Sequence, residues 1–342
     1  MTDLSYVAYT DDVEQPQPDE DELIEKTIAS MRTMREEAFQ RHQHGLRDAH
    51  AKSHAVLRGE LIVDADLPDH LRQGLFAQPA TYPIIVRISS AQAEIRSDQN
   101  AALRGFAIKV LGVSGPRSLP GDEGTNHDIM LVNYPTLPFG DVRKYLAAQE
   151  AALEQSRHPE LPAGAEIPGA PNVHVLGETF HSMAAIRYGD FIAKLSAAPL
   201  SESVRALTGQ PVDPALGPGA LSALAAEFFA NNGAEYELRA QLCADLETMP
   251  VEDASVLWPE SQSPHRPIGK VAIPAQQAYS TARRIYADDV LSFNPWHSLA
   301  AHRPLGSVNR ARIKAYQTSS VHRHQLNDTP RIEPRDISDL PA

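Results

Sequence analysis

The chain has 342 residues, 42% of them hydrophobic, so it can bury the core of one large domain or of two small ones. Its 31 Lys and Arg residues against 44 Asp and Glu residues give a net charge of −13, which argues against nucleic-acid binding through broad electrostatic attraction. A single cysteine, Cys243, excludes an intrachain disulfide, and no stretch approaches the ~20 apolar residues of a membrane span.

The N-terminal residues are acidic and rich in Pro and Gln, which predicts an extended or disordered arm over residues 1–21. They contain no apolar run typical of a signal peptide, so we expect a cytoplasmic protein. A helix is predicted over residues 22–45, where Leu23, Ile28 and Met31 recur at helical spacing and Gly45 can end the helix.

Strand-like runs rich in Val, Ile and Leu begin after this helix, separated by Pro, Gly, Asp and Asn. They cover residues 54–63, 82–90, 104–111 and 128–133, with further candidates at 179–197, 234–246 and 267–273. Helices are predicted at 141–157 and 310–326, short helices in the Pro- and Ala-rich stretch 199–226, and largely irregular structure at 275–309. Together these elements predict an α+β fold: an antiparallel β-barrel with surrounding helices over residues 46–330, followed by a polar tail over 331–342.

One motif near the C-terminal end could hold a metal ion. Tyr316 lies four residues after Arg312 and seven before Arg323. A phenol has a pKa of about 10, and an arginine within hydrogen-bond reach favours the phenolate. A phenolate suits ferric iron, and tyrosine is a known axial ligand of haem. The alternative is a solvated helix face.

Histidines before the first predicted strand form a second candidate. His50, in the motif Arg47-Asp-Ala-His50, could serve as an acid or base near neutral pH. The pairs His42/His44 and His50/His54 also have spacings seen in metal sites, but no Glu-x-x-His or cysteine set accompanies them. The plainer alternative is that these histidines are scattered polar residues.

Two strand positions complete the candidates. In the run 82–90, Arg87 and Ser89 share one face with Ala91, so Arg87 could reach a carboxylate, or could lie in solvent on an edge strand. Asn133 ends an apolar run, where an asparagine can be a turn residue or a catalytic one.

The order and identity of these motifs resemble the haem catalase family. The resemblance extends from about Arg47 to Arg323, with gaps in the middle. Its most specific parts are Arg47-x-x-His50-Ala51-Lys52, Arg104-Gly105-Phe106-Ala107, Leu257-Trp258-Pro259 and Arg312-x3-Tyr316-x6-Arg323. The chain is similar in particular to a small, catalase-related (mini-catalase or peroxidase) subgroup, because little sequence follows the tyrosine motif.

The resemblance implies haem b (iron protoporphyrin IX) as the cofactor. Tyr316 would be the iron ligand, Arg312 would pair with its phenolate, and Phe293 would pack on the haem. Three arginines would bind the haem propionates: Arg47, Arg87 and Arg323. Bidentate pairing with carboxylates suits arginine better than lysine.

On the other side of the haem, the resemblance implies a catalytic site. His50 would move the peroxide proton, Asn133 would position the peroxide and Ser89 would hydrogen-bond His50. Two departures from the family pattern leave the substrate open. Ala91 stands where the family has a larger valine, and Tyr134 stands where a second asparagine is typical.

The function implied is haem-dependent decomposition of hydrogen peroxide, or peroxidase activity with organic donors or hydroperoxides, through a ferryl intermediate. The partners expected are peroxide or an organic hydroperoxide, a small organic electron donor and further copies of the chain in a homo-oligomer. Two alternatives remain: rearrangement of fatty-acid hydroperoxides at the same haem, and non-catalytic haem binding.

Overall fold

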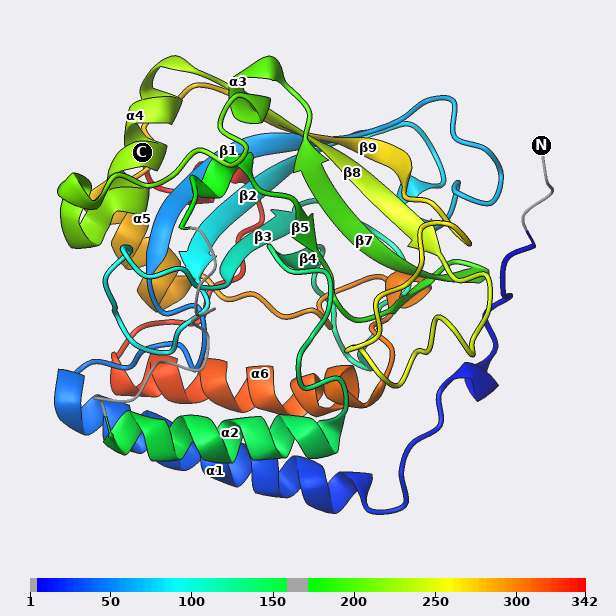
Figure 1. Ribbon diagram of the computed structural model, residues 1–342, viewed down its shortest axis with the longest axis horizontal. Helices are drawn as coiled ribbons and strands as arrows, with labels where there is room; N and C mark the ends of the chain where they lie inside the picture. The colour runs from blue at the N-terminus through cyan, green and yellow to red at the C-terminus, as the bar shows by residue number, and fades with distance from the viewer. Residues whose placement is uncertain (1–4, 159–171) are drawn as a thin grey trace.

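The computed structural model describes residues 5–158 and 172–342. Within them, antiparallel strands form one sheet in the order β5-β4-β3-β2-β1-β9-β8-β7-β6. Because β5 pairs with β7 as well as with β4, eight of these strands close into a barrel, and β6 adds to the free edge of β7 (Figure 1). The strands are β1 Ser53–Val63, β2 Thr81–Ser90, β3 Arg104–Val110, β4 His127–Val132, β5 Phe180–His181, β6 Ile186–Tyr188, β7 Phe191–Pro199, β8 Ala234–Leu242 and β9 Arg266–Ile273.

The barrel has two distinct faces, because successive side chains of a strand point in opposite directions. Its interior is an apolar core to which Leu57, Val86, Ile108 and Leu131 contribute from the first four strands. The other face of these strands, here called the outer face, carries the alternate residues. On this face, residues of neighbouring strands lie side by side: Arg87 of β2 pairs with Ala107 of β3, and Ala107 pairs with Met130 of β4.

Helices cover part of the outer face. The helices α1 Glu20–His42, α2 Val142–Arg157 and α6 Ser307–Leu326 lie together below the barrel in Figure 1. Val132 on β4 packs in one cluster with Val308 and Ala311 of α6, so α6 runs against the outer face. The shorter helices are α3 Glu202–Arg205, α4 Ala220–Asn231 and α5 Thr281–Ile285, the last followed by a π-helical turn at Tyr286–Val290.

Most predicted elements are confirmed. The first four predicted strands match β1–β4 to within one residue at each end, and the predicted helices at 22–45, 141–157 and 310–326 appear as α1, α2 and α6. The single run at 179–197 is wrong as one strand, because it holds β5, β6 and β7. Gly189 makes the tight turn between β6 and β7 with a φ of 61°, which glycine adopts without strain. The stretch 275–309 is less irregular than predicted, since it contains α5 and the π-helical turn.

The described residues near both ends of the chain pack on the barrel. In the predicted arm, Ala8 bridges Phe191 and the Val7 N–H donates to the Cys243 carbonyl at 2.9 Å. In the predicted polar tail, Glu333 binds the buried Lys109 at 2.9 Å. The arm therefore lies along its own chain, and the tail covers part of the outer face.

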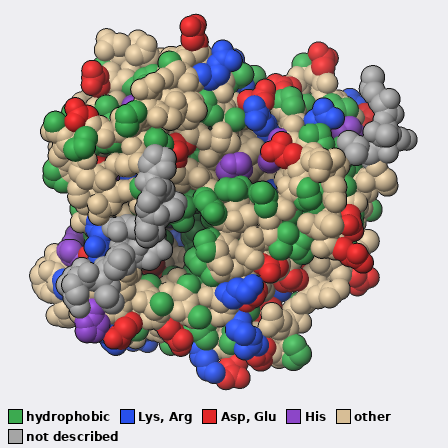
Figure 2. Space-filling model, in the orientation of Figure 1, with side chains coloured by type: hydrophobic (Ala, Val, Ile, Leu, Met, Phe, Trp, Pro, Cys, Tyr) green, Lys and Arg blue, Asp and Glu red, His purple; other side chains and the backbone are tan. Residues whose placement is uncertain are grey.

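The surface of the molecule is mixed. Figure 2 shows hydrophobic side chains near the centre of one face, with charged side chains mostly towards its edges. No helix in the described part of the chain has the length and apolar character needed to cross a bilayer.

Candidate functional site

The site begins on one face of α6. Arg312, Tyr316 and Arg323 are spaced by four and seven residues, so they point to the same side of the helix. Tyr316 is half-buried, and no hydrogen bond joins its hydroxyl to any described residue. Burial raises the pKa of Tyr316, Arg312 lowers it and Asp48 raises it. The phenol therefore stays protonated unless a further positive charge comes close.

Three predicted propionate ligands, Arg47, Arg87 and Arg323, converge on the π-helical turn. Arg47 donates to the carbonyl oxygens of Asp288 at 3.0 Å and Leu291 at 2.6 Å. Arg323 donates to the same two carbonyl oxygens. Arg87 reaches the Asp288 carboxylate at 3.0 Å and the His50 carbonyl at 2.9 Å.

This arginine cluster is buried and its members repel one another, although the carboxylates of Asp288 and Asp289 partly offset this. Burial, followed by repulsion from Arg323 and Arg87, holds the pKa of Arg47 well below its usual value. Burial and repulsion from Arg87 lower the pKa of Arg323 to about 10. The buried Nε of Arg87 has no hydrogen-bond partner among the described residues. Guanidinium groups in this state favour an anionic ligand, and carboxylates match their geometry.

Asp288 is a site residue that the sequence did not reveal. Its carboxylate accepts hydrogen bonds from Arg87 and from the Ser53 hydroxyl at 3.1 Å, and lies 3.6 Å from Arg47. It stands in a stretch predicted to be irregular, so no strand or helix periodicity marked it. The only available signal was indirect: three clustered arginines require a counter-charge. Ser53 thus helps to hold that counter-charge.

His50 is held in an unusual backbone conformation. Its φ of 58° is rare for a residue other than glycine, and such strain often marks functional positions. Its N–H donates to the Ala91 carbonyl at 3.1 Å, and its Nδ1 lies 3.0 Å from the Ser89 hydroxyl. The ring lies directly over Gly105, where a Cβ atom would come within 2.6 Å of Cε1 and Nδ1. These contacts leave Nε2 as the free edge, with no partner among the described residues.

The electrostatic surroundings keep His50 neutral. Burial, Arg87, Arg312 and Arg47 together lower its pKa to about 3. Because Arg312 acts on both His50 and Tyr316, the two residues face one common region. A neutral imidazole with a free Nε2 can accept a proton at physiological pH.

Asn133 lies one residue beyond the end of β4, and among the described residues its side chain contacts Arg104 and Glu178 but not His50. Val132 pairs with Gly105, on which the His50 ring rests, and the Asn133 N–H donates to the Arg104 carbonyl at 3.0 Å. Its side-chain Oδ1 accepts the Arg104 N–H at 2.6 Å, and its Nδ2 donates to Glu178. Glu178 is a second residue that the sequence did not reveal.

Phe293 lies farther along the outer face. Its ring is 5.3 Å from the Lys109 ammonium, and it packs beside Val56 and Ile85. Ile85 precedes Arg87 by two residues on the same face of β2, so Phe293 borders the arginine cluster.

The outer face is open to solvent between these groups. Ala107 and Met130 are only half-buried, although the residues on either side of them in β3 and β4 are buried. They lie in register with Arg87 and on the face that α6 approaches. The site thus has the Arg87 strand on one side and the Tyr316 helix on the other.

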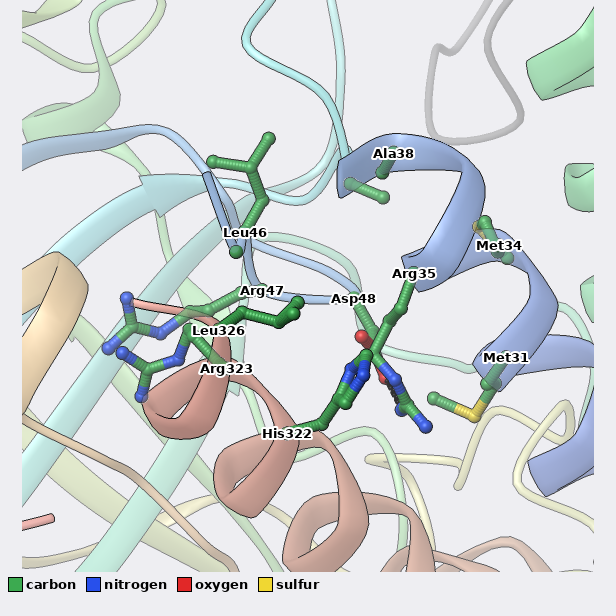
Figure 3. A pocket seen from close by; sticks show the side chains of 12 residues that line it. Met31, Met34, Arg35, Ala38, Leu46, Arg47, Asp48, His322, Arg323 and Leu326 are labelled. Carbon is green, nitrogen blue, oxygen red and sulfur yellow. Dashed lines mark hydrogen bonds and ion pairs between the residues drawn. The ribbon is translucent and has the colours of Figure 1, made fainter. Parts of the chain in front are cut away.

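A pocket adjoins the arginine cluster. It opens between α1 and α6, with Arg47 and Arg323 on one wall and the buried ion pair of Arg35 and Asp48 on another (Figure 3). Its lining includes neither His50 nor Tyr316, so it reaches only the far side of the cluster.

The histidine pairs that the sequence offered as an alternative metal site do not come together in the structure. His42 pairs with Glu94, His44 pairs with Asp289, and His54 contacts Ser90, so the histidines have separate partners. Among residues 5–158 and 172–342, no three His, Cys, Asp or Glu side chains form a group that could hold a metal ion.

Comparison with known proteins identifies the fold. No protein-family model matches the chain, and no curated protein matches its sequence. The structure is similar to that of a fungal catalase, with a TM-score of 0.62 and 17% identity over 89% of this chain and 68% of that one. It is also similar to catalase A from Saccharomyces cerevisiae, with a TM-score of 0.59 and 16% identity over 89% and 70% of the two chains. The predicted catalase-like barrel is therefore confirmed, and the small subgroup stays a prediction.

Proposed function

We propose that this chain, whose fold is that of the catalases, binds haem b between the outer face of β2–β4 and α6, and breaks down peroxides there. The convergence of Arg47, Arg87 and Arg323, together with Tyr316 on the same helix as Arg323 and without a hydrogen-bond partner among the described residues, carries the proposal. A haem has two carboxylates, which suit a buried cluster of three arginines. Its ferric iron would supply the positive charge that the buried Tyr316 phenol needs to ionise.

The residues around the cofactor would have separate roles. Tyr316 would be the iron ligand, with Arg312 favouring its phenolate, and the three arginines would hold the propionates. Haem would supply the redox chemistry that cleaves the peroxide bond.

The proton transfer belongs to His50. Its free Nε2 would take the proton from the peroxide oxygen nearer the iron and return it to the departing oxygen, so that water leaves. Ser89 would hold the ring through Nδ1, and Gly105 would let it lie flat against β3. The resemblance would add an N–H donated by Asn133 to the peroxide, although its amide is held by Arg104 and Glu178 in this structure.

The substrate range would extend beyond hydrogen peroxide. Ala91 is small and half-buried, follows the last residue of β2, and accepts the His50 N–H with its carbonyl at 3.1 Å, so it would leave room near His50 for an organic group. We therefore propose catalase activity combined with peroxidase activity towards organic donors or hydroperoxides. Ala91→Val should reduce turnover of organic substrates more than turnover of hydrogen peroxide, and equal losses would remove Ala91 from substrate selection.

The test is the visible spectrum of the purified protein, followed by oxygen evolution on addition of hydrogen peroxide. We expect a ferric tyrosinate-ligated haem spectrum and oxygen release. A protein from haem-replete cells without Soret absorption would refute the proposal. Conversion of a fatty-acid hydroperoxide to an epoxide or carbonyl product without oxygen release would assign the site to rearrangement instead. Haem binding without turnover of any peroxide would assign it to haem carriage.

A further inference from the structure

Arg35 of α1 is buried with part of its hydrogen-bonding capacity unused. Its side chain is 7% exposed, and its Nη1 donates to the Asp48 carboxylate at 2.6 Å. The buried Nε of Arg35 has no hydrogen-bond partner among the described residues. Because a buried donor without a partner is unfavourable, this group favours a ligand that accepts a hydrogen bond.

The unused edge of Arg35 has the geometry that a carboxylate needs. A guanidinium group can donate two parallel hydrogen bonds to the two oxygens of one carboxylate. The hydrogen bond that Arg35 makes within the described chain comes from Nη1, so Nε and Nη2 stay available as such a pair. Asp48 occupies one side of the guanidinium group, and a second carboxylate fits on the other.

Arg35 lines the pocket between α1 and α6, and the polar part of that lining favours an anion (Figure 3). His322 of α6 lies close by, since burial and then the charge of Arg35 lower the pKa of His322, and its buried Nδ1 also has no partner among the described residues. Arg47 and Arg323 form another wall. The described lining thus contains three guanidinium groups and one carboxylate, that of Asp48.

Much of the remaining lining is apolar. The helix α1 contributes Met31, Met34 and Ala38, and Leu46 and Leu326 add to them. Methionine side chains are flexible and make favourable contacts with aromatic rings, so this wall can adapt to a ring that enters the pocket. A ring that carries a carboxylate matches both parts of the lining.

We propose that this pocket binds a small aromatic carboxylate, which pairs with Nε and Nη2 of Arg35, and that this ligand is the organic electron donor of the proposed reaction. The pocket shares Arg47 and Arg323 with the arginine cluster, but its lining includes neither His50 nor Tyr316. A ligand there would lie at the propionate edge of the haem and not at its iron, which suits an electron donor and not a peroxide. The donor role rests on the proposed function, whereas the binding does not.

A phenolic acid is the class of donor that this arrangement suits. Each phenol gives up one electron and one proton and becomes a phenoxyl radical. Two such molecules supply the two electrons and two protons that convert one hydrogen peroxide into two waters. Peroxide is the oxidant, so the reaction needs no further reactant.

Binding is measured in the haem-free protein, with benzoate as the probe and the methyl resonances of the six methionines as the readout. Benzoate should shift the resonances of Met31 and Met34, which line the pocket, and leave that of Met249, which packs in a separate cluster with Trp258. Met130 is half-buried on the outer face, in the strand register of Arg87. A shift of Met130 without shifts of Met31 and Met34, or no shift at all, would overturn the proposal.

Two variants locate the bound carboxylate. Arg35→Lys keeps a positive charge beside Asp48 but removes the paired donors, so the affinity for benzoate should fall about tenfold or more. Ala38→Phe fills the pocket without touching the ion pair, and should weaken benzoate binding as strongly. Ala29→Phe is the matched control, because it makes the same change at an exposed position of α1 and should bind benzoate as the wild type does. Thermal melting checks the fold of each variant, and wild-type affinity in either folded pocket variant would overturn the proposal.

The donor role is tested in the haem-loaded protein, with 4-hydroxybenzoate and 4-hydroxybenzamide as alternative electron donors for hydrogen peroxide. The value of kcat/KM should favour the acid about tenfold or more, because the amide cannot form the charged pair with Arg35. This preference should fall towards one in Arg35→Lys and persist in Ala29→Phe. Equal use of the two donors by the wild type, or an unchanged preference in Arg35→Lys, would overturn the donor role. A protein that binds benzoate but no haem would refute the proposed function and the donor role, and would leave the carboxylate site established.

Discussion

Gly105 offers a direct test of the His50 position. An alanine there would place its Cβ atom 2.6 Å from His50 Cε1 and Nδ1, and 2.9 Å from the Ser89 hydroxyl. Ordinary contacts begin at 3.4 Å, so the imidazole must move by about 0.8 Å. Gly105 lies within strand β3 and has no positive φ, so the backbone itself accepts alanine. The added methyl group therefore clashes only with the imidazole of His50 and the hydroxyl of Ser89, which are hydrogen-bonded to each other.

The expected result is a loss of turnover without a loss of haem. A displacement of about 1 Å in a reacting group can cost about a hundredfold in rate, so we expect peroxide breakdown in Gly105→Ala to fall about tenfold to a hundredfold. The crowding should destabilise the fold by about 1–3 kcal/mol. Oxygen evolution measures the rate of peroxide breakdown, Soret absorbance measures haem content and chemical denaturation measures the free energy of unfolding.

Two comparisons make this result specific. Gly219→Ala is the matched control, since a Cβ atom there meets nothing within 4 Å, and it should behave as the wild type. Adding His50→Ala to Gly105→Ala should cost no more than His50→Ala alone. Wild-type turnover in Gly105→Ala, with haem bound and the fold intact, would refute the placement of His50 over Gly105 as a requirement of the reaction.

Three further predictions concern the ligand, the pH range and the arginine cluster. The Tyr316→Phe variant should lose its Soret absorbance on gel filtration, because the iron ligand is removed. Its haem-free form should melt at the same temperature as the wild type, because the Tyr316 hydroxyl has no partner among the described residues. Retained haem would refute the ligand assignment. Since burial and three arginines lower the pKa of His50 to about 3, the imidazole of the haem-free protein should stay neutral above about pH 4, as followed by its ring proton resonances; a titration centred near pH 6.5 would contradict this. Asp288→Asn should destabilise the haem-free protein by about 1–2 kcal/mol in chemical denaturation, a modest value because the Asp288 side chain is 27% exposed. The loss of stability should be smaller in the haem-loaded protein, because the haem carboxylates would then share the arginines. Equal losses with and without haem would argue against this shared pairing.

The sequence predicted local structure well where the pattern was regular. β1–β4 carry runs of β-branched residues bounded by turn residues, and α6 carries a regular helical spacing. The run 179–197 was misread because its turn at Gly189 interrupts residues that are apolar on both sides. The alternation of apolar residues is judged over several residues, so it does not reveal a turn of only two residues.

The candidate site was predictable in part for a similar reason. Tyr316, Arg312 and Arg323 share one helix face, and Arg87 and Ser89 share one strand face, so spacing alone groups them. Asp288 and Glu178 act through contacts across 201 and 45 residues of sequence, respectively, which no local pattern encodes. Their partners had to be brought together by the barrel before their roles could be inferred.

The order of the elements along the chain has a consequence for assembly. All the strands of the closed barrel have been made once Ile273 is reached, whereas α6, with Tyr316, starts only at Ser307. During synthesis, N-terminal parts of a chain can fold first, at about 5–20 residues per second. The barrel can thus close while its outer face still lacks α6, and docking of α6 then acts as the closing step. A haem bound between β2–β4 and α6 would then be enclosed only when α6 docks, after the barrel has closed.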